Sequence, residues 1–143
     1  MFIGEYSATI DEKGRVSIPS KFRQELKGKA IVTRGLDNSL FLYTETEWLK
    51  VAEKLSTLPF SKSNTRAFSR LMLAGAMDCE IDKNGRIILP EYLRYFAKIK
   101  KKVVIAGLYS RLEIWGEELW QKYKAETEKD SNKIAEQLGE LGV

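Results

Sequence analysis

The chain carries one charged segment twice, and this repeat limits the folds that are open to it. Residues 10–19 read IDEKGRVSIP and residues 81–90 read IDKNGRIILP, so Asp, Gly, Arg and Pro recur at the same offsets. A shift of 71 residues aligns the two segments, and a shift of 72 aligns the hydrophobic stretches that follow them. An internal repeat of this kind indicates two similar supersecondary units of roughly fifty residues each.

Each unit has the same predicted plan of two hairpins and two helices. In the first unit, ATIDEKGRVSIP reads as two strands joined by a turn, in which Gly14 can take a left-handed conformation. Pro19 ends the second strand and opens a short helix, SKFRQEL, with Ser20 near its start. AIVTRGLDNSLFLY then predicts a second hairpin, and ETEWLKVAEKL predicts an amphipathic helix. The second unit follows the same plan with VVIAGLYSRLEIW and GEELWQKYKAE.

The predicted strands are too short for one unit of roughly fifty residues to enclose a stable core by itself. We therefore expect a single α+β domain: a two-repeat, swapped-hairpin β-barrel with pseudo-twofold symmetry and flanking helices. The expected segments are a first repeat, a linking helix, a second repeat and a helical tail, at residues 1–58, 59–76, 77–126 and 127–143. Alternation along the strands places six aliphatic side chains in the core, namely Ile10, Val16, Ile18, Ile81, Ile87 and Leu89.

The chain has no His, and Cys79 is its only cysteine. This composition excludes Ser–His and Cys–His catalytic pairs, a Cys/His metal cluster and an internal disulfide. We interpret Cys79, beside an apolar strand, as a small buried hydrophobe. No stretch approaches the roughly 20 apolar residues that cross a bilayer, and the N-terminal segment lacks the pattern of a secretory signal. We therefore expect a cytosolic protein without a metal or cofactor.

The charge of the chain is mildly basic and unevenly distributed. The formal net charge is +4, with a sequence pI near 9.1. Residues 1–75 contain 12 Lys and Arg against 8 Asp and Glu, whereas residues 76–143 contain 12 of each class. An excess of this size also fits ordinary surface solvation, so charge alone does not establish nucleic-acid binding.

The repeated turn joins an aspartate to an arginine four residues later. Asp11 precedes Arg15, and Asp82 precedes Arg86, each across a predicted turn. The carboxylate can accept hydrogen bonds from N–H groups of the turn or pair with the guanidinium. For one copy, the simpler interpretation is a turn cap with a surface partner. Because the pattern occurs twice, we favour arginines in a fixed orientation, whose forked guanidinium can bind phosphate or a guanine edge.

The motifs DEKGR at 11–15 and DKNGR at 82–86, with the opening MFIGEYSATIDEKGRVSIPSKFR, resemble the MraZ family over essentially the whole chain. The resemblance implies a bacterial transcriptional regulator, not an enzyme, that binds G-rich direct repeats in its own promoter at the head of the division and cell wall gene cluster. It implies a fold related to AbrB and MazE, with both hairpins in one chain, and a ring-shaped homo-oligomer. The implied partners are double-stranded promoter DNA and further copies, without a membrane or small-molecule ligand, in the cytoplasm and at the nucleoid. Occupying the promoter would block polymerase, and the same contacts are compatible with activation.

The resemblance also assigns roles to individual residues. The DNA-reading turn of the first copy comprises Lys13, Gly14 and Arg15, with Asp11 as the group that orients Arg15. The second copy supplies the corresponding set Asp82, Lys83, Gly85 and Arg86. We expect the first copy to dominate, because the net positive charge lies in its half of the chain. Three further cations are candidate phosphate contacts, although a solvated helix face is the simpler explanation for Lys21, Arg23 and Lys29.

Two other classes of function remain open at this point. An antitoxin-like interaction module would bind a protein partner through its helices, with Trp48, Trp120 and the tail as the functional parts. An enzyme would need a carboxylate or lysine site that no motif in this chain defines, and the absence of His weighs against it.

Overall fold

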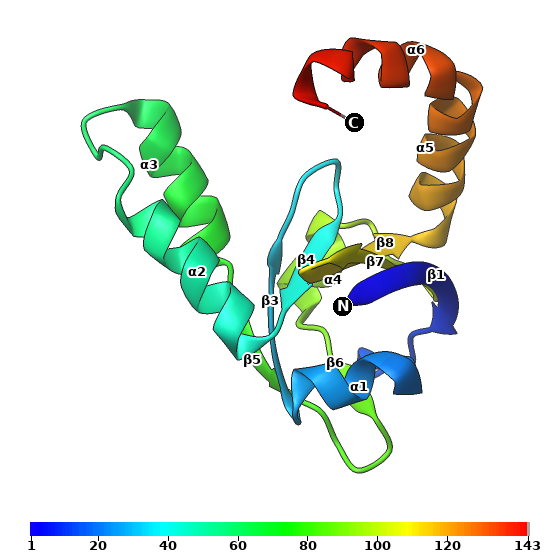
Figure 1. The fold of residues 1–143 in the computed structure, drawn as a ribbon. Helices are drawn as coiled ribbons and strands as arrows, with labels where there is room; N and C mark the ends of the chain where they lie inside the picture. The colour runs from blue at the N-terminus through cyan, green and yellow to red at the C-terminus, as the bar shows by residue number, and fades with distance from the viewer. Residues whose placement is uncertain (143) are drawn as a thin grey trace.

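The computed structural model describes residues 1–142, which form a six-stranded antiparallel sheet, a two-stranded ribbon and several helices (Figure 1). The strands are β1 (Phe2–Thr9), β2 (Arg15–Ser17), β3 (Lys29–Arg34), β4 (Leu40–Tyr43), β5 (Met77–Glu80), β6 (Arg86–Ile88), β7 (Lys102–Tyr109) and β8 (Arg111–Gly116). The helical segments are α1 (Ser20–Leu26), α2 (Glu45–Ser56), α3 (Ser63–Ser69), the π-helical turn η1 (Arg70–Ala74), α4 (Glu91–Phe96), α5 (Glu117–Lys129), α6 (Ser131–Gln137) and the 3-10 turn η2 (Gly139–Leu141). Within residues 1–142, no helix is long and apolar enough to cross a bilayer.

The large sheet has the strand order β1-β7-β8-β4-β3-β5, which is pseudo-symmetric. The shift that aligns the sequence repeats relates β1 to β5, β3 to β7 and β4 to β8, and so maps this order onto its own reverse. The first strand of each repeat pairs with the third strand of the other repeat, β1 with β7 and β5 with β3. Each repeat therefore completes its part of the sheet with a strand from the other.

The second hairpin of each repeat is confirmed, because β3 pairs with β4 and β7 pairs with β8. In the GLDNS turn, Asp37 and Asn38 have φ angles of 58° and 61°, the conformation of a type I′ hairpin turn. The predicted first hairpin is wrong in extent. Among the described residues, β1 and β2 meet only next to the turn, at the isolated bridge between Ile10 and Val16, because β2 pairs with β6 of the other repeat.

The expected closed barrel is not found in residues 1–142. The fold is α+β and its repeats exchange strands, but β1 and β5 lie at opposite ends of the open sheet and the β2–β6 ribbon is separate from it. The ribbon strands contain three residues each. Pro19 and Pro90 follow closely and begin helices, so these strands are too short to join the two edges of the sheet.

The main core lies between the sheet, the ribbon and the helices α1 and α4. Its largest fully buried side chains include Phe2, Phe22, Ile18, Leu40, Ile87, Leu89, Leu93 and Ile105. Five of the six aliphatic side chains predicted as core are buried, and Ile81 is partly buried. Cys79 is buried as predicted, and burial raises the pKa of its thiol to about 11. A smaller cluster around Phe41, Tyr43, Leu55 and Met72 joins α2 and η1 to the sheet.

Three predicted helices are confirmed as α1, α2 and α5. The cap position of α1 is Pro19 and makes no side-chain hydrogen bond, so Ser20 does not cap this helix. Two helical arms extend from the sheet in Figure 1: α2 with α3, and α5 with α6. Between the two repeats the chain forms α3 and η1, which cover only part of the linking helix expected over residues 59–76.

We expect residues 1–75 alone not to fold as a monomer, because β1 and β3 would lose their partners β7 and β5. A second copy of the fragment could replace the missing repeat, so its stability should rise with concentration. Circular dichroism during thermal unfolding, over a wide range of concentrations, checks this expectation, with the full chain as control. Cooperative unfolding of a monomeric fragment at a concentration-independent temperature would show that strand exchange is dispensable.

Candidate nucleic-acid interface

Asp11 fixes both the first turn and the side chain that follows it. Its Oδ1 accepts hydrogen bonds from the backbone N–H groups of Lys13 at 3.0 Å and Arg15 at 2.9 Å. Its Oδ2 accepts a further hydrogen bond from Nε of Arg15 at 2.6 Å. Gly14 has a φ of 84°, in the left-handed region that favours glycine, and its N–H donates to the Asp11 carbonyl. One carboxylate thus holds the backbone and the guanidinium in a single geometry.

The second turn repeats this arrangement. Oδ1 of Asp82 accepts hydrogen bonds from the backbone N–H groups of Asn84 and Arg86, both at 2.9 Å. Oδ2 accepts from Nε of Arg86 at 3.2 Å, and Gly85 has a φ of 77°. Both interactions that the sequence allowed for the aspartate, capping of the turn and pairing with the arginine, are therefore present in each copy.

Both aspartates have a pKa below the ordinary value of an aspartate side chain. The main cause for Asp11 is the hydrogen bond from the backbone N–H of Arg15, and the guanidinium lowers the pKa further. For Asp82 the main cause is the corresponding N–H of Arg86. An aspartate is charged at neutral pH in any case, and the lowered pKa keeps each carboxylate charged, and paired with its arginine, further into acidic solution.

The β2–β6 ribbon brings the two arginines onto one surface. Arg15 lies opposite Ile88, and Arg86 lies opposite Ser17. Between these pairs, Val16 lies opposite Ile87, and both are buried. Because side chains alternate across a strand, the inner face of the ribbon joins the core and both arginines lie on its outer face. They occupy diagonal positions, which sheet geometry separates by roughly 7–8 Å.

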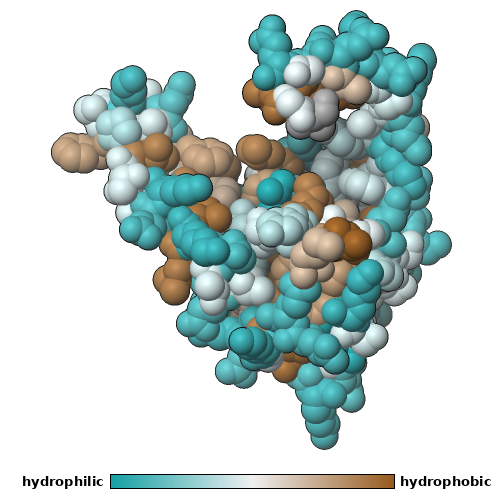
Figure 2. All heavy atoms as spheres, viewed as in Figure 1, coloured by the Kyte–Doolittle hydropathy of each residue, from teal (hydrophilic) through white to brown (hydrophobic). Residues whose placement is uncertain are grey.

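The outer face of the ribbon is accessible to solvent. The side chains of Arg15 and Arg86 are 32% and 30% exposed. The turn between β5 and β6 forms the lower end of the molecule in Figure 1, and hydrophilic residues cover this end in Figure 2. The structure therefore joins two motifs that are far apart in sequence into one solvent-accessible surface, on which the exposed Ile88 lies opposite Arg15.

Backbone hydrogen bonds tie each turn to the other repeat. The carbonyl of Gly14 accepts from the N–H of Leu89 at 2.8 Å, and the carbonyl of Gly85 accepts from the N–H of Ile18 at 2.9 Å. A Cβ at Gly14 would lie 2.8 Å from the Leu89 carbonyl oxygen, so the close approach itself requires glycine. Neither turn is a free loop.

Arg23 and Arg94 support the turns from the opposite repeats. The Arg23 guanidinium lies against Gly85, where it leaves no space for a Cβ, and the Arg94 guanidinium lies against Gly14. Nε of Arg23 donates to the Ile18 carbonyl at 2.7 Å, and Arg94 makes the equivalent bond in its own repeat. Arg23 was predicted as a candidate phosphate contact, and these bonds give it a structural role. Arg94 was missed, although it aligns with Arg23 in the repeat.

The remaining predicted cations have different surroundings. Lys13 and Lys83 are exposed in their turns, but the repeat places Asn84, not Lys83, at the position of Lys13. The ammonium group of Lys21 lies 5.7 Å from the centre of the Tyr6 ring. Lys29 forms an ion pair with Asp78 at 3.5 Å. Within residues 1–142, no group of three or more His, Cys, Asp or Glu is arranged to hold a metal ion.

We expect acid to weaken the fold through Asp11 and Asp82. A lowered pKa in the folded state stabilises the fold at neutral pH, and this contribution is lost as the pH falls from the ordinary aspartate value through the lowered one. NMR titration should therefore give both carboxyl groups midpoints below that of an aspartate in an unfolded peptide. Asp11→Asn should remove part of the acid sensitivity in urea unfolding, whereas Asp130→Asn serves as a control without a side-chain cap bond. Titration of both groups at the ordinary value would contradict the geometry.

Comparison with known proteins gives a consistent result over the whole chain. The model of the family described as "MraZ protein, putative antitoxin-like" matches residues 1–71 and again residues 72–140, once for each repeat. The chain is 50% identical over 143 residues to "Transcriptional regulator MraZ" of Caldanaerobacter subterraneus subsp. tengcongensis, covering all of both chains. It is 51% identical over 138 residues to the protein of that name from Carboxydothermus hydrogenoformans, 96% of each chain. It is 48% identical over 143 residues, all of both chains, to the Pediococcus pentosaceus protein.

Proposed function

Because this chain belongs to the MraZ family, we propose that it is a transcription regulator that binds double-stranded promoter DNA through the β2–β6 ribbon. The observation that carries this proposal is the shared outer face of Arg15 and Arg86. The major groove of DNA admits a two-stranded ribbon, and arginine is the side chain that most often makes two hydrogen bonds to one guanine. The binding site is accordingly the pair of turns and the ribbon between them.

The aspartates prepare the arginines for this role. Asp11 and Asp82 accept hydrogen bonds from Nε, which leaves the terminal guanidinium nitrogens free to donate to a base edge as a fork. A side chain that is ordered before binding loses less conformational freedom when the complex forms. The ion pair at Arg15 is shorter than that at Arg86, 2.6 Å against 3.2 Å. Arg15 is therefore the main reading residue in this proposal.

We expect Arg15→Ala to weaken specific promoter binding by about five- to 150-fold, since one bidentate base contact is worth about 1–3 kcal/mol. Arg86→Ala should have a smaller effect. Arg15→Lys should not restore binding, because an ammonium group cannot make the forked contact. Fluorescence anisotropy with a fragment of the promoter of its own operon measures the affinities. Lys133→Ala, which removes an exposed cation from α6, is the control for charge, and equal affinity of wild type and Arg15→Ala would refute the reading role.

We propose further that several copies form a ring that meets G-rich direct repeats in the promoter of the division and cell wall gene cluster. One ribbon covers only a few base pairs, so a single contact is weak, whereas linked contacts gain a high effective concentration. Direct repeats require head-to-tail interfaces, which can close as rings. Exposed apolar side chains on the arm of α2 and α3, including Leu49, Phe60 and Phe68, are candidates for such an interface. Bound in this way at the nucleoid, the protein would block polymerase as a repressor.

Inserting about five base pairs between two promoter repeats should reduce affinity towards that of the isolated repeats. The insertion turns the second site through roughly half a turn of the duplex and away from the neighbouring subunit. Inserting about ten base pairs should partly restore binding, because the two sites face the same way again. Gel-shift titration measures both effects, and light scattering verifies that the assembly of the protein is the same in every sample. Unchanged affinity after the half-turn insertion would exclude the ring mechanism.

A further inference from the structure

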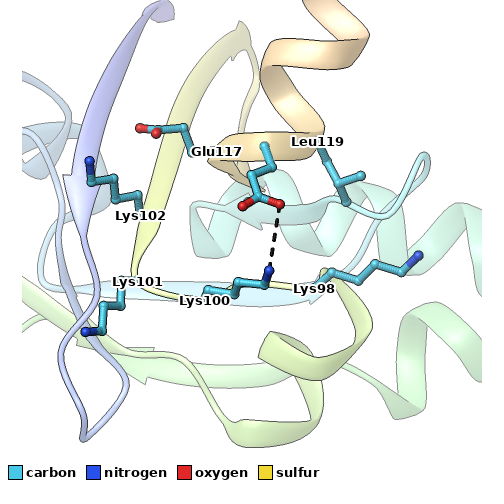
Figure 3. Close-up of a pocket in the computed structure, with 8 residues that line it drawn as sticks. Lys98, Lys100, Lys101, Lys102, Glu117 and Leu119 are labelled. Atoms are coloured by element: carbon cyan, nitrogen blue, oxygen red, sulfur yellow. Dashed lines mark ion pairs between the residues drawn. The ribbon is translucent and has the colours of Figure 1, made fainter.

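A dense group of lysines lies outside the site described so far. Four exposed lysines lie at the start of β7: Lys98, Lys100 and Lys101 between α4 and the strand, and Lys102 as its first residue. With the start of α5 they line a surface cavity of about 510 Å³ (Figure 3). Lys100 lies 3.8 Å from Glu118, and both side chains are largely exposed, so this ion pair contributes little. Within residues 1–142, the other three lysines form no ion pair within 4 Å.

This lysine run belongs to the second repeat but lies beside the turn of the first. Lys102 pairs with Thr9 at the end of β1. The next residue, Ile10, donates its N–H to the Lys101 carbonyl at 2.8 Å, and the turn begins at Asp11 directly afterwards. In Figure 3 the side chains of Lys101 and Lys102 extend towards β1, whereas that of Lys98 points the opposite way. Strand exchange thus brings cations of the second repeat to the first turn.

The second turn also has lysines beside it, but fewer than the first. Ile81 donates its N–H to the Gly28 carbonyl at 2.9 Å, so Lys27 and Lys29 are its flanking cations. Lys29 is already paired with Asp78. The backbone contact beside the first turn thus lies among Lys100, Lys101 and Lys102, whereas the contact beside the second turn lies between Lys27 and Lys29.

The four lysines repel one another, because they lie within five consecutive residues. A polyanion placed beside the loop relieves this repulsion, and lysine binds phosphate as a point charge without reading sequence. The adjacent acidic side chains, Glu117 and Glu118, are on the α5 side of the cavity. Lys101 and Lys102 are on the side of β1 and the first turn.

We propose that Lys101 and Lys102 bind backbone phosphates of the DNA whose bases the first turn reads; this inference rests on the proposed function. The two lysines supply affinity for any DNA sequence, and Arg15 supplies discrimination. In this proposal the first turn binds DNA more tightly than the second, because the two lysines beside it come from the second half of the chain.

The test compares Lys101→Gln/Lys102→Gln with wild type on the promoter fragment and on a scrambled fragment, over a series of salt concentrations. Loss of two phosphate contacts should reduce the slope of log affinity against log salt by about 1.8 for each bound subunit, at about 0.9 per contact. Affinity for both fragments should fall by a similar factor, so that their ratio is unchanged. Lys101→Arg/Lys102→Arg should keep the wild-type slope, because it keeps both positive charges. This variant therefore distinguishes the loss of charge from damage to the fold.

Lys129→Gln/Lys133→Gln, which removes two exposed cations from α5 and α6, is the matched control and should leave the slope nearly unchanged. An equal change of slope in this control would overturn the proposal, because the effect would then come from total charge. An unchanged slope in Lys101→Gln/Lys102→Gln, with Arg15→Ala still defective, would overturn the lysine site alone. Failure of the wild type to prefer its promoter over scrambled DNA would overturn the proposed function as well.

Discussion

The pairing of β2 with β6 is the interaction on which the rest of the structure depends. Each strand has three residues, and a ladder this short would be unstable by itself in water. Two features stabilise it. First, Val16 and Ile87 are buried on its inner face, and burial of each side chain stabilises the fold by about 1.5–3 kcal/mol. Second, the backbone hydrogen bonds from Ile18 to Gly85 and from Leu89 to Gly14 extend the pairing on both sides of the ladder. The two repeats are thus joined at the place where the two arginines lie.

The ion pairs in the turns matter for geometry more than for stability or attraction. Ion pairs at the surface add little to stability, because water and salt screen them and two side chains must be held in place. An aspartate paired with an arginine also has no net charge, so Asp11 and Arg15 together do not attract a polyanion over a distance. In our proposal the attraction comes from the lysines beside the turn, and the paired arginine discriminates between bases. The two tasks lie on different side chains that strand exchange brings together.

The sequence predicted the features that depend on near neighbours. The bonds of Asp11 to its own turn, the left-handed glycines, the second hairpins and the helices all arise within about a dozen residues. The partners of β1, β2 and β5 could not be predicted, because strands of three to eight residues carry too little pattern to fix a partner elsewhere in the chain. For the same reason the role of Arg94 and the position of Lys101 were missed. Counting the charge of each half of the chain does not give the charge beside each turn, because strand exchange places residues of one half next to the turn of the other.

The contact of Arg23 with Gly85, and of Arg94 with Gly14, also bears on how such a chain can change during evolution. Each glycine is covered by a guanidinium that is encoded in the other half of the gene. A larger residue at position 85 would be strained at a φ of 77° and would displace the Arg23 guanidinium, so a single substitution would disturb both halves. After a duplication, repeats are ordinarily free to diverge, and one copy can decay while the other keeps the function. Here the two halves constrain each other's sequence, and we expect them to have diverged together.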